Sequence, residues 1–85
     1  MEYKDIYEKI WKIIEKIKGL QINDRDMLEP LTGRKYDMDA VDMVYLVLEI
    51  QNNFNLTLLN VDFEAYKFIS VDGIVKIIKE KMDYY

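Results

Sequence analysis

A nearly continuous apolar run at the centre of the chain constrains its fold more than any other feature. Between residues 40 and 48 only Asp42 and the hydroxyl of Tyr45 are polar, and neither glycine nor proline interrupts residues 39–54. Asp39 is a suitable N-cap, and Asp42 lies in the first turn, where a carboxylate stabilises a helix. The run predicts a helix of about 24 Å. Its apolar surface exceeds one core-facing stripe, so this helix is either deeply buried or shows a second apolar face to a partner.

Two other segments have the apolar periodicity of amphipathic helices. The first, residues 2–18, ends before Gly19, a suitable C′ residue with Leu20 as its hydrophobic contact. Its apolar residues are Tyr3, Ile6, Tyr7, Ile10, Trp11, Ile13, Ile14 and Ile17. The second, residues 71–82, has Ser70 as a suitable N-cap. Its apolar residues are Val71, Ile74, Val75, Ile77, Ile78 and Met82.

The connections between these predicted helices differ in length. A loop as long as residues 20–38 is unusual in a compact domain, so we expect apolar side chains to hold it against the core. The candidates are Leu20, Ile22, Met27, Leu28 and Leu31. Residues 55–61 predict a loop, and residues 62–66 predict a single helical turn with Phe63 and Tyr66 facing inward. The pattern predicts one all-α domain over residues 1–85.

Composition excludes several classes of protein. The chain has no cysteine and no histidine, so it lacks disulfides, thiol chemistry and the commonest general base and metal ligand. A net charge of −4 disfavours nucleic acid as a partner. No apolar run approaches the ~20 residues of a membrane span, and the first residues lack the features of a signal peptide. We therefore expect a cytoplasmic protein that binds neither nucleic acid nor membrane.

The sequence contains no recognisable catalytic or metal-binding motif. Asp37, Asp39 and Asp42 do not form a calcium loop, because the fifth and twelfth places counted from Asp37 are Val41 and Leu48. The three glycines form no phosphate-binding loop, and the single serine suits a helix cap. We expect no enzymatic activity, no bound metal and no catalytic residue.

The central run also carries a family resemblance. Asp39–Leu46, which reads Asp-Ala-Val-Asp-Met-Val-Tyr-Leu, with Phe54 further along, resembles the second helix of acyl carrier proteins. That family has Asp-Ser-Leu there, and its serine carries the phosphopantetheine arm. In this chain Ala40 occupies the serine position, and alanine has no hydroxyl to form the phosphodiester. The approach to the motif, residues 31–38, is also longer than the family's Asp-Leu-Gly.

The resemblance implies a fold and a docking surface. It implies an acyl-carrier-like bundle of three main helices plus one short helix, closely over residues 37–82 and in outline over residues 1–36. It places Leu46, Val47, Ile50 and Phe54 in the core.

The resemblance also implies a docking surface. It places Val41, Val44 and Leu48, with acidic Asp39 and Asp42, on the face that meets partner enzymes. Tyr45, Gln51 and Asn52 replace family acids, and Met43 adds apolar bulk. The predicted partner-binding residues are Asp39, Val41, Asp42, Met43, Val44, Tyr45 and Leu48. The alternative is that these residues only fill a thick core.

Three functional hypotheses remain open. The first is a non-catalytic interaction or scaffold module without the prosthetic arm, whose partner docks on residues 40–54. Residues 31–34 and 40–46 resemble acyl-carrier-related proteins of peptide-maturation systems, so that partner would be a biosynthetic or peptide-maturation enzyme. The second is a carrier in which Ala40 replaces a native serine that held thioester intermediates on 4′-phosphopantetheine. The third is an unrelated helical adaptor.

Overall fold

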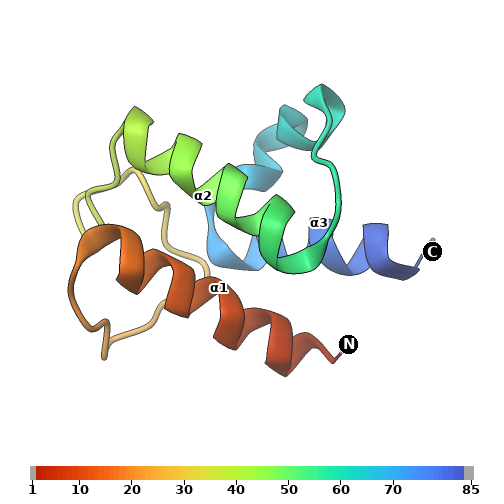
Figure 1. Cartoon of the computed structure of the whole chain (residues 1–85). Coiled ribbons are helices and arrows are strands. Elements are labelled where there is room, and N and C mark those ends of the chain that lie inside the picture. Colours follow the sequence, from red (N-terminus) through yellow and green to blue (C-terminus); the bar gives the residue numbers. More distant parts are fainter. Residues whose placement is uncertain (1, 84–85) are drawn as a thin grey trace.

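The computed structural model describes residues 2–83, except for the side chains of residues 64–67. It contains helices α1 (Tyr3–Lys18), α2 (Ala40–Phe54) and α3 (Val71–Asp83), with a 3-10 helix, η1 (Asn60–Ile69), between α2 and α3. No strand occurs within the described range, so the all-α prediction is confirmed. Figure 1 shows α1 and α2 joined by the long loop at one end, and both chain termini at the other end.

Local capping residues set the helix boundaries, as the sequence predicts. The Asp39 carboxylate accepts a hydrogen bond from the Asp42 backbone N–H at 2.8 Å, and the Asp42 carboxylate accepts one from the Asp39 N–H at 3.1 Å. This reciprocal capping box satisfies two N–H groups that would otherwise lack partners. Asn55 ends α2 in the left-handed conformation, with φ of 52°. The Ser70 hydroxyl accepts from the Gly73 N–H at 3.2 Å and caps α3.

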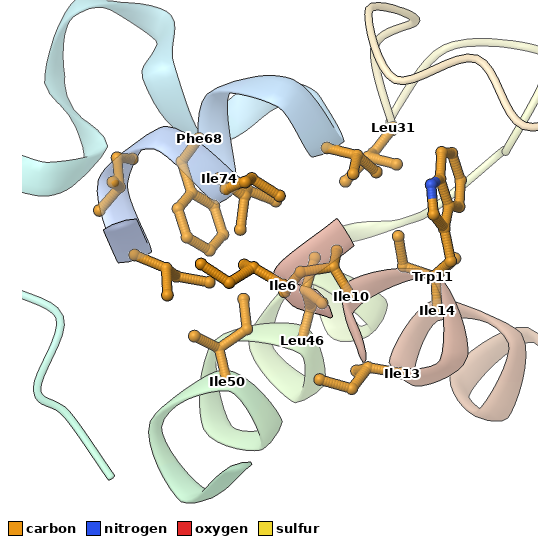
Figure 2. Close-up of a cluster of buried hydrophobic side chains, with 14 of the residues drawn as sticks. Ile6, Ile10, Trp11, Ile13, Ile14, Leu31, Leu46, Ile50, Phe68 and Ile74 are labelled. Carbon is orange, nitrogen blue, oxygen red and sulfur yellow. The ribbon is translucent and has the colours of Figure 1, made fainter. Parts of the chain in front are cut away.

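The core lies where α1 packs against both α2 and α3, and Figure 2 shows its side chains converging from these helices. Its fully buried side chains are all aliphatic: Ile6, Ile10, Ile14, Leu31, Leu46, Ile50, Val71, Ile74, Val75 and Ile78. Among the described side chains, none that is polar or charged is buried. The core is therefore held by apolar burial and packing rather than by buried polar bonds.

The long loop is anchored by a different set of residues from the one expected. Ile22 and Leu31 are buried as predicted, but Leu20, Met27 and Leu28 are exposed, Leu28 to 68%. Tyr36 and Met38, which the sequence analysis did not single out, are buried. The Leu31 N–H donates to the Ile69 carbonyl at 2.8 Å, and the Met38 N–H donates to the Leu31 carbonyl at 3.0 Å. These backbone bonds hold the part of the loop in which Leu31 and Met38 are buried.

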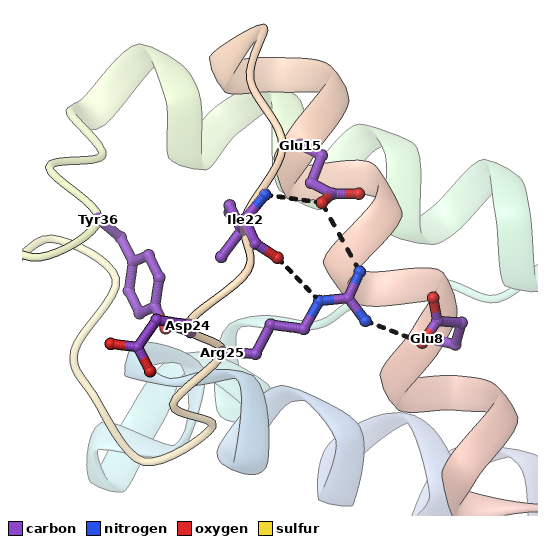
Figure 3. Close-up of polar contacts among 6 residues, drawn as sticks. All are labelled: Glu8, Glu15, Ile22, Asp24, Arg25 and Tyr36. Carbon is purple, nitrogen blue, oxygen red and sulfur yellow. Dashed lines mark hydrogen bonds and ion pairs between the residues drawn. The ribbon is translucent and has the colours of Figure 1, made fainter.

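Arg25 ties the same loop to α1, as Figure 3 shows. Its Nη1 lies 2.9 Å from Glu8 Oε2 and its Nη2 lies 3.6 Å from Glu15 Oε2. Its Nε donates to the Ile22 carbonyl at 3.3 Å, while the Ile22 N–H donates to Glu15 at 2.8 Å. The guanidinium carbon also lies 5.8 Å from the centre of the Trp11 ring. One arginine thus fixes the start of the loop through several partly exposed contacts.

The segment before α3 also differs from its prediction. A 3-10 helix over Asn60–Ile69 is longer than the expected turn at residues 62–66. Phe63 is 40% exposed, whereas Phe68 is buried and packs edge-on against Phe63, with ring centres 4.9 Å apart. The prediction that Phe63 faces inward is therefore wrong, because Phe68 fills that place. The Tyr66 side chain lies outside the described residues.

Tyr7 and Asp72 join α1 to the first turn of α3. The Tyr7 hydroxyl donates to Asp72 Oδ1 at 2.6 Å, and Lys76 Nζ lies 3.0 Å from Asp72 Oδ2. Burial, followed by this hydrogen bond, raises the pKa of Tyr7 to about 12. The bond from Tyr7, with Lys76, lowers the pKa of Asp72 below its ordinary value. Both shifts favour a neutral tyrosine beside an ionised aspartate.

Tyr7→Phe should lower the free energy of unfolding by about 1 kcal/mol at neutral pH, because it removes one hydrogen bond to a carboxylate. The raised pKa of Tyr7 contributes stability that is present below about pH 10 and is lost as pH rises towards 12. The lowered pKa of Asp72 contributes stability that is lost as pH falls below about 4. Urea melts across pH should show the parent–variant difference shrinking at both extremes. Tyr3→Phe, at a 49% exposed tyrosine of the same helix, makes the same chemical change and is the control for loss of a tyrosine hydroxyl at neutral pH, where its cost should be smaller.

None of the helices within residues 2–83 combines the length and apolarity that a membrane crossing requires.

Candidate docking surface

Four apolar side chains form a row on the outer surface of α2, and we call this row the α2 stripe. It consists of Val41, Val44, Tyr45 and Leu48, which are 60%, 58%, 56% and 49% exposed. Their spacing of three and four residues puts them on one side of the helix. The opposite side is buried: Leu46, Ile50 and Phe54 are in the core, and Val47 is half-buried against it. The thick-core alternative therefore does not describe this helix, since its outer row is left uncovered by the described chain.

Met43 does not share the exposure of the α2 stripe. It is half-buried and packs against the core. Because successive helical residues are about 100° apart, Met43 projects well away from Val41 and Tyr45, towards η1. The expectation that Met43 lies on one exposed patch with the stripe is wrong for this reason.

The acidic side chains along α2 are already paired within the molecule. Asp42 Oδ2 lies 3.2 Å from Lys18 Nζ, and Glu49 Oε2 lies 3.4 Å from Lys16 Nζ. Lys18 also donates to the Asp37 carbonyl at 2.9 Å, so it links the end of α1 to the start of α2. The backbone N–H of Asp39, followed by Lys18, lowers the pKa of Asp42. A partner that approaches the α2 stripe therefore meets apolar groups flanked by largely neutralised pairs.

Asp39 and Ala40 occupy the start of α2. Asp39 is exposed and acts as the N-cap, as predicted. Ala40 is also exposed, and its methyl group offers neither a nucleophile nor a metal ligand. Within the described part of the chain, no three acidic side chains gather to hold a metal ion. The residues present can position an apolar partner but cannot carry a covalent arm at residue 40.

An apolar groove with a volume of about 310 Å³ lies beside the α2 stripe, between α2 and η1. We call it the α2–η1 groove, and the residues with described side chains that line it are Met43, Val44, Val47, Phe63, Phe68 and Ile69. Val44 belongs to both features and connects them. The sequence pattern alone does not reveal this groove, because the motif places Val47 in the core and Phe68 lies outside the predicted helices. The apolar pair at residues 68 and 69 before the Ser70 cap was the available signal.

Comparison with known proteins does not assign the chain to a family. No protein-family model matches the chain, and no curated protein matches it significantly. The acyl-carrier resemblance accordingly rests on the sequence alone, closely over residues 37–82 and in outline over residues 1–36.

Proposed function

We propose that this chain is a non-catalytic interaction module on which a protein partner docks through the α2 stripe. The supporting observation is the row of four large apolar side chains, each about half exposed or more, on one helix face. Contiguous exposed apolar surface on a small domain is typical of a binding site. Desolvation of the stripe would supply most of the binding energy, with Asp39 and Asp42 orienting the partner at its edge.

We further propose that the module is an acyl-carrier-like domain without the prosthetic arm, serving a biosynthetic or peptide-maturation enzyme. The motif around Ala40 supports this assignment, together with an all-α bundle in which Leu46 and Ile50 point inward and the α2 stripe points outward. No cofactor is required for this role.

Tyr45→Lys should leave the melting temperature nearly unchanged, since the side chain is 56% exposed and a solvated surface tolerates charge. The same change should abolish capture of the partner from a lysate of the source cell, because it places a charge in an apolar interface. Leu28→Lys is the matched control: Leu28 is 68% exposed but lies in the long loop, so capture should persist. Raised salt should weaken capture by the parent only modestly, given the internal pairing of Asp42 and Glu49.

Two results would contradict this proposal. If Tyr45→Lys unfolds the protein, the residue contributes to the core. If the variant stays folded and still captures the partner, docking takes place elsewhere. Met43→Glu is unsuitable for this test, because Met43 is half-buried and a carboxylate there should lower the melting temperature on its own.

Incubation with coenzyme A and a promiscuous phosphopantetheinyl transferase should leave the intact mass of the chain unchanged, because Ala40 has no hydroxyl to accept the arm. Ala40→Ser restores that hydroxyl at an exposed position in the first turn of α2. If the variant gains the arm, the surrounding surface is still that of a carrier, which favours the hypothesis that Ala40 replaces a native serine. If it does not, the approach loop or the acids replaced along α2 have also removed transferase recognition. An arm mapped on the parent would contradict the prediction.

A further inference from the structure

The first part of the long loop, residues 23–30, lies between two buried apolar residues, and we call it the loop strap. Ile22 precedes it and Leu31 follows it, and both are buried. Within the loop strap itself no side chain is buried, since Glu29 is half-buried and the others are exposed. Apolar burial therefore holds the two ends of the loop strap but not its middle, so Ile22 and Leu31 can serve as hinges.

Ion pairs between partly exposed groups hold the loop strap in place, and Figure 3 shows those of Arg25. Arg25 pairs with Glu8 and Glu15 of α1 at 2.9 and 3.6 Å. Lys35 pairs with Asp24 at 3.1 Å, and the Asp24 side chain is 93% exposed. Ion pairs in contact with solvent contribute little to stability, and salt weakens them further. The middle of the loop strap is therefore held by its weakest kind of contact.

Two backbone hydrogen bonds join the loop strap to the rest of the molecule. The Asp26 N–H donates to the hydroxyl of buried Tyr36 at 2.7 Å. The Asp72 N–H donates to the Met27 carbonyl at 2.8 Å. Asp72 lies in the first turn of α3, where a backbone N–H has no acceptor within its own helix. Both bonds break when the loop strap moves away, so the Asp26 and Asp72 amides should become open to hydrogen exchange together.

The loop strap covers Trp11 without packing tightly against α1. An open cleft with a volume of about 630 Å³ lies between the loop strap and the first half of α1. Its lining residues are Lys4, Tyr7, Glu8, Trp11 and residues 24–28. Trp11 is 4% exposed, and its ring centre lies 5.8 Å from the Arg25 guanidinium and 5.5 Å from the Tyr36 ring. Opening of the loop strap removes the guanidinium and exposes that part of the indole, at little cost in apolar packing.

We propose that the loop strap opens as a unit about Ile22 and Leu31, that the ion pairs of Arg25 hold it closed, and that raised ionic strength opens it and uncovers Trp11. Salt acts on the ion pairs of the loop strap but not on the core, whose described side chains are all apolar. The packing of α1 against α2 and α3 therefore persists in the open state. The contacts involved are with α1, α3 and Tyr36, so this inference does not depend on docking at the α2 stripe.

Amide hydrogen exchange, measured by NMR on the whole chain, tests this inference. NaCl is raised from about 10 mM to about 1 M, which shortens the Debye length from ~30 to ~3 Å. The Asp26 and Asp72 amides should lose protection by the same factor as NaCl rises. The Leu31 and Met38 amides, which donate to the Ile69 and Leu31 carbonyls, should keep theirs. If all four lose protection equally, the long loop opens as a whole and the inference is wrong.

Arg25→Ala should lower the protection of the Asp26 and Asp72 amides about tenfold at low salt and remove most of its salt dependence. Arg34→Ala is the matched control, because it makes the same chemical change at the other arginine of the loop. Among the described side chains Arg34 has no ion pair, so its loss should change neither amide. Glu8→Gln breaks the shorter pair from the side of α1 and should give a smaller loss of protection, which keeps the test valid if Arg25→Ala does not fold.

The fluorescence of Trp11, the only tryptophan of the chain, gives an independent measurement. Quenching by acrylamide, which is uncharged, should increase with NaCl in the parent and should already be high at low salt in Arg25→Ala. Far-UV circular dichroism should stay unchanged in both. If quenching rises only where the helical signal falls, global unfolding exposes Trp11 and the inference fails. It also fails if salt raises the protection of the Asp26 amide, or if Arg25→Ala and Glu8→Gln leave that protection unchanged.

Discussion

Replacing Leu46 by alanine should lower the free energy of unfolding by about 2–5 kcal/mol, because the side chain is fully buried and its removal leaves a cavity between α1 and α2. Leu48→Ala is the matched control: it makes the same chemical change two residues away in the same helix, at a position that is 49% exposed. Its cost should be much smaller. Urea denaturation followed by circular dichroism measures both free energies of unfolding. If the free energy falls equally steeply with urea concentration in the two variants, both expose similar surface on unfolding, and their values can be compared directly.

Phe54→Ala tests the C-terminal end of the buried side of α2. Phe54 is buried at the last turn of α2, with Lys9 Nζ 5.5 Å from the centre of its ring. A loss of about 3–5 kcal/mol is expected for a buried phenylalanine. If Leu46→Ala and Phe54→Ala melt like the parent, the inward side of α2 has been misassigned, and the outward assignment of the α2 stripe fails with it.

Leu31→Ala should cost about 2–5 kcal/mol, although the residue lies in a loop, because Leu31 is fully buried beside the helices. Leu28→Ala, three residues earlier in the same loop and 68% exposed, should change the stability by no more than about 0.5 kcal/mol. Thermal and urea melts of the two variants provide the comparison.

Equal effects of these two substitutions would mean that the loop is not held as the structure shows. A selective effect at Leu31 would also link the loop to α2, since the Met38 N–H that leads into the docking helix donates to the Leu31 carbonyl at 3.0 Å. Amide hydrogen exchange on Leu31→Ala should then show faster exchange at Met38 and Asp37, because local opening of the loop exposes both amides.

Helix positions could be predicted from the sequence because they depend on neighbours in the chain. Asp39 and Asp42 form the capping box of α2 across three residues, and Ser70 caps α3 across the same distance. The apolar spacing of Ile6, Ile10 and Ile14 likewise determines which side of α1 is buried. These interactions span one turn of helix, so a linear pattern contains them.

The candidate site could be predicted only in part. The motif implied that Val41, Val44 and Leu48 point outward, and helical geometry extends this direction to Tyr45. The same pattern could not show that Met43 is half-buried, because that depends on how close η1 lies to α2. It also could not show that Asp42 and Glu49 are neutralised by lysines 24 and 33 residues away.

By itself, the sequence determined three helices, their caps and an apolar central segment, since each of these is a property of residue types and short spacings. Only the tertiary structure decided which apolar side chains of the long loop are buried. Leu28 and Leu31 are chemically identical, but Leu28 is 68% exposed whereas Leu31 is fully buried, and the Leu31 N–H donates to the Ile69 carbonyl, 38 residues further along the chain. The α2–η1 groove has the same origin: η1 packs on α3 while α2 packs on α1, and the space between α2 and η1 follows from those two separate packings.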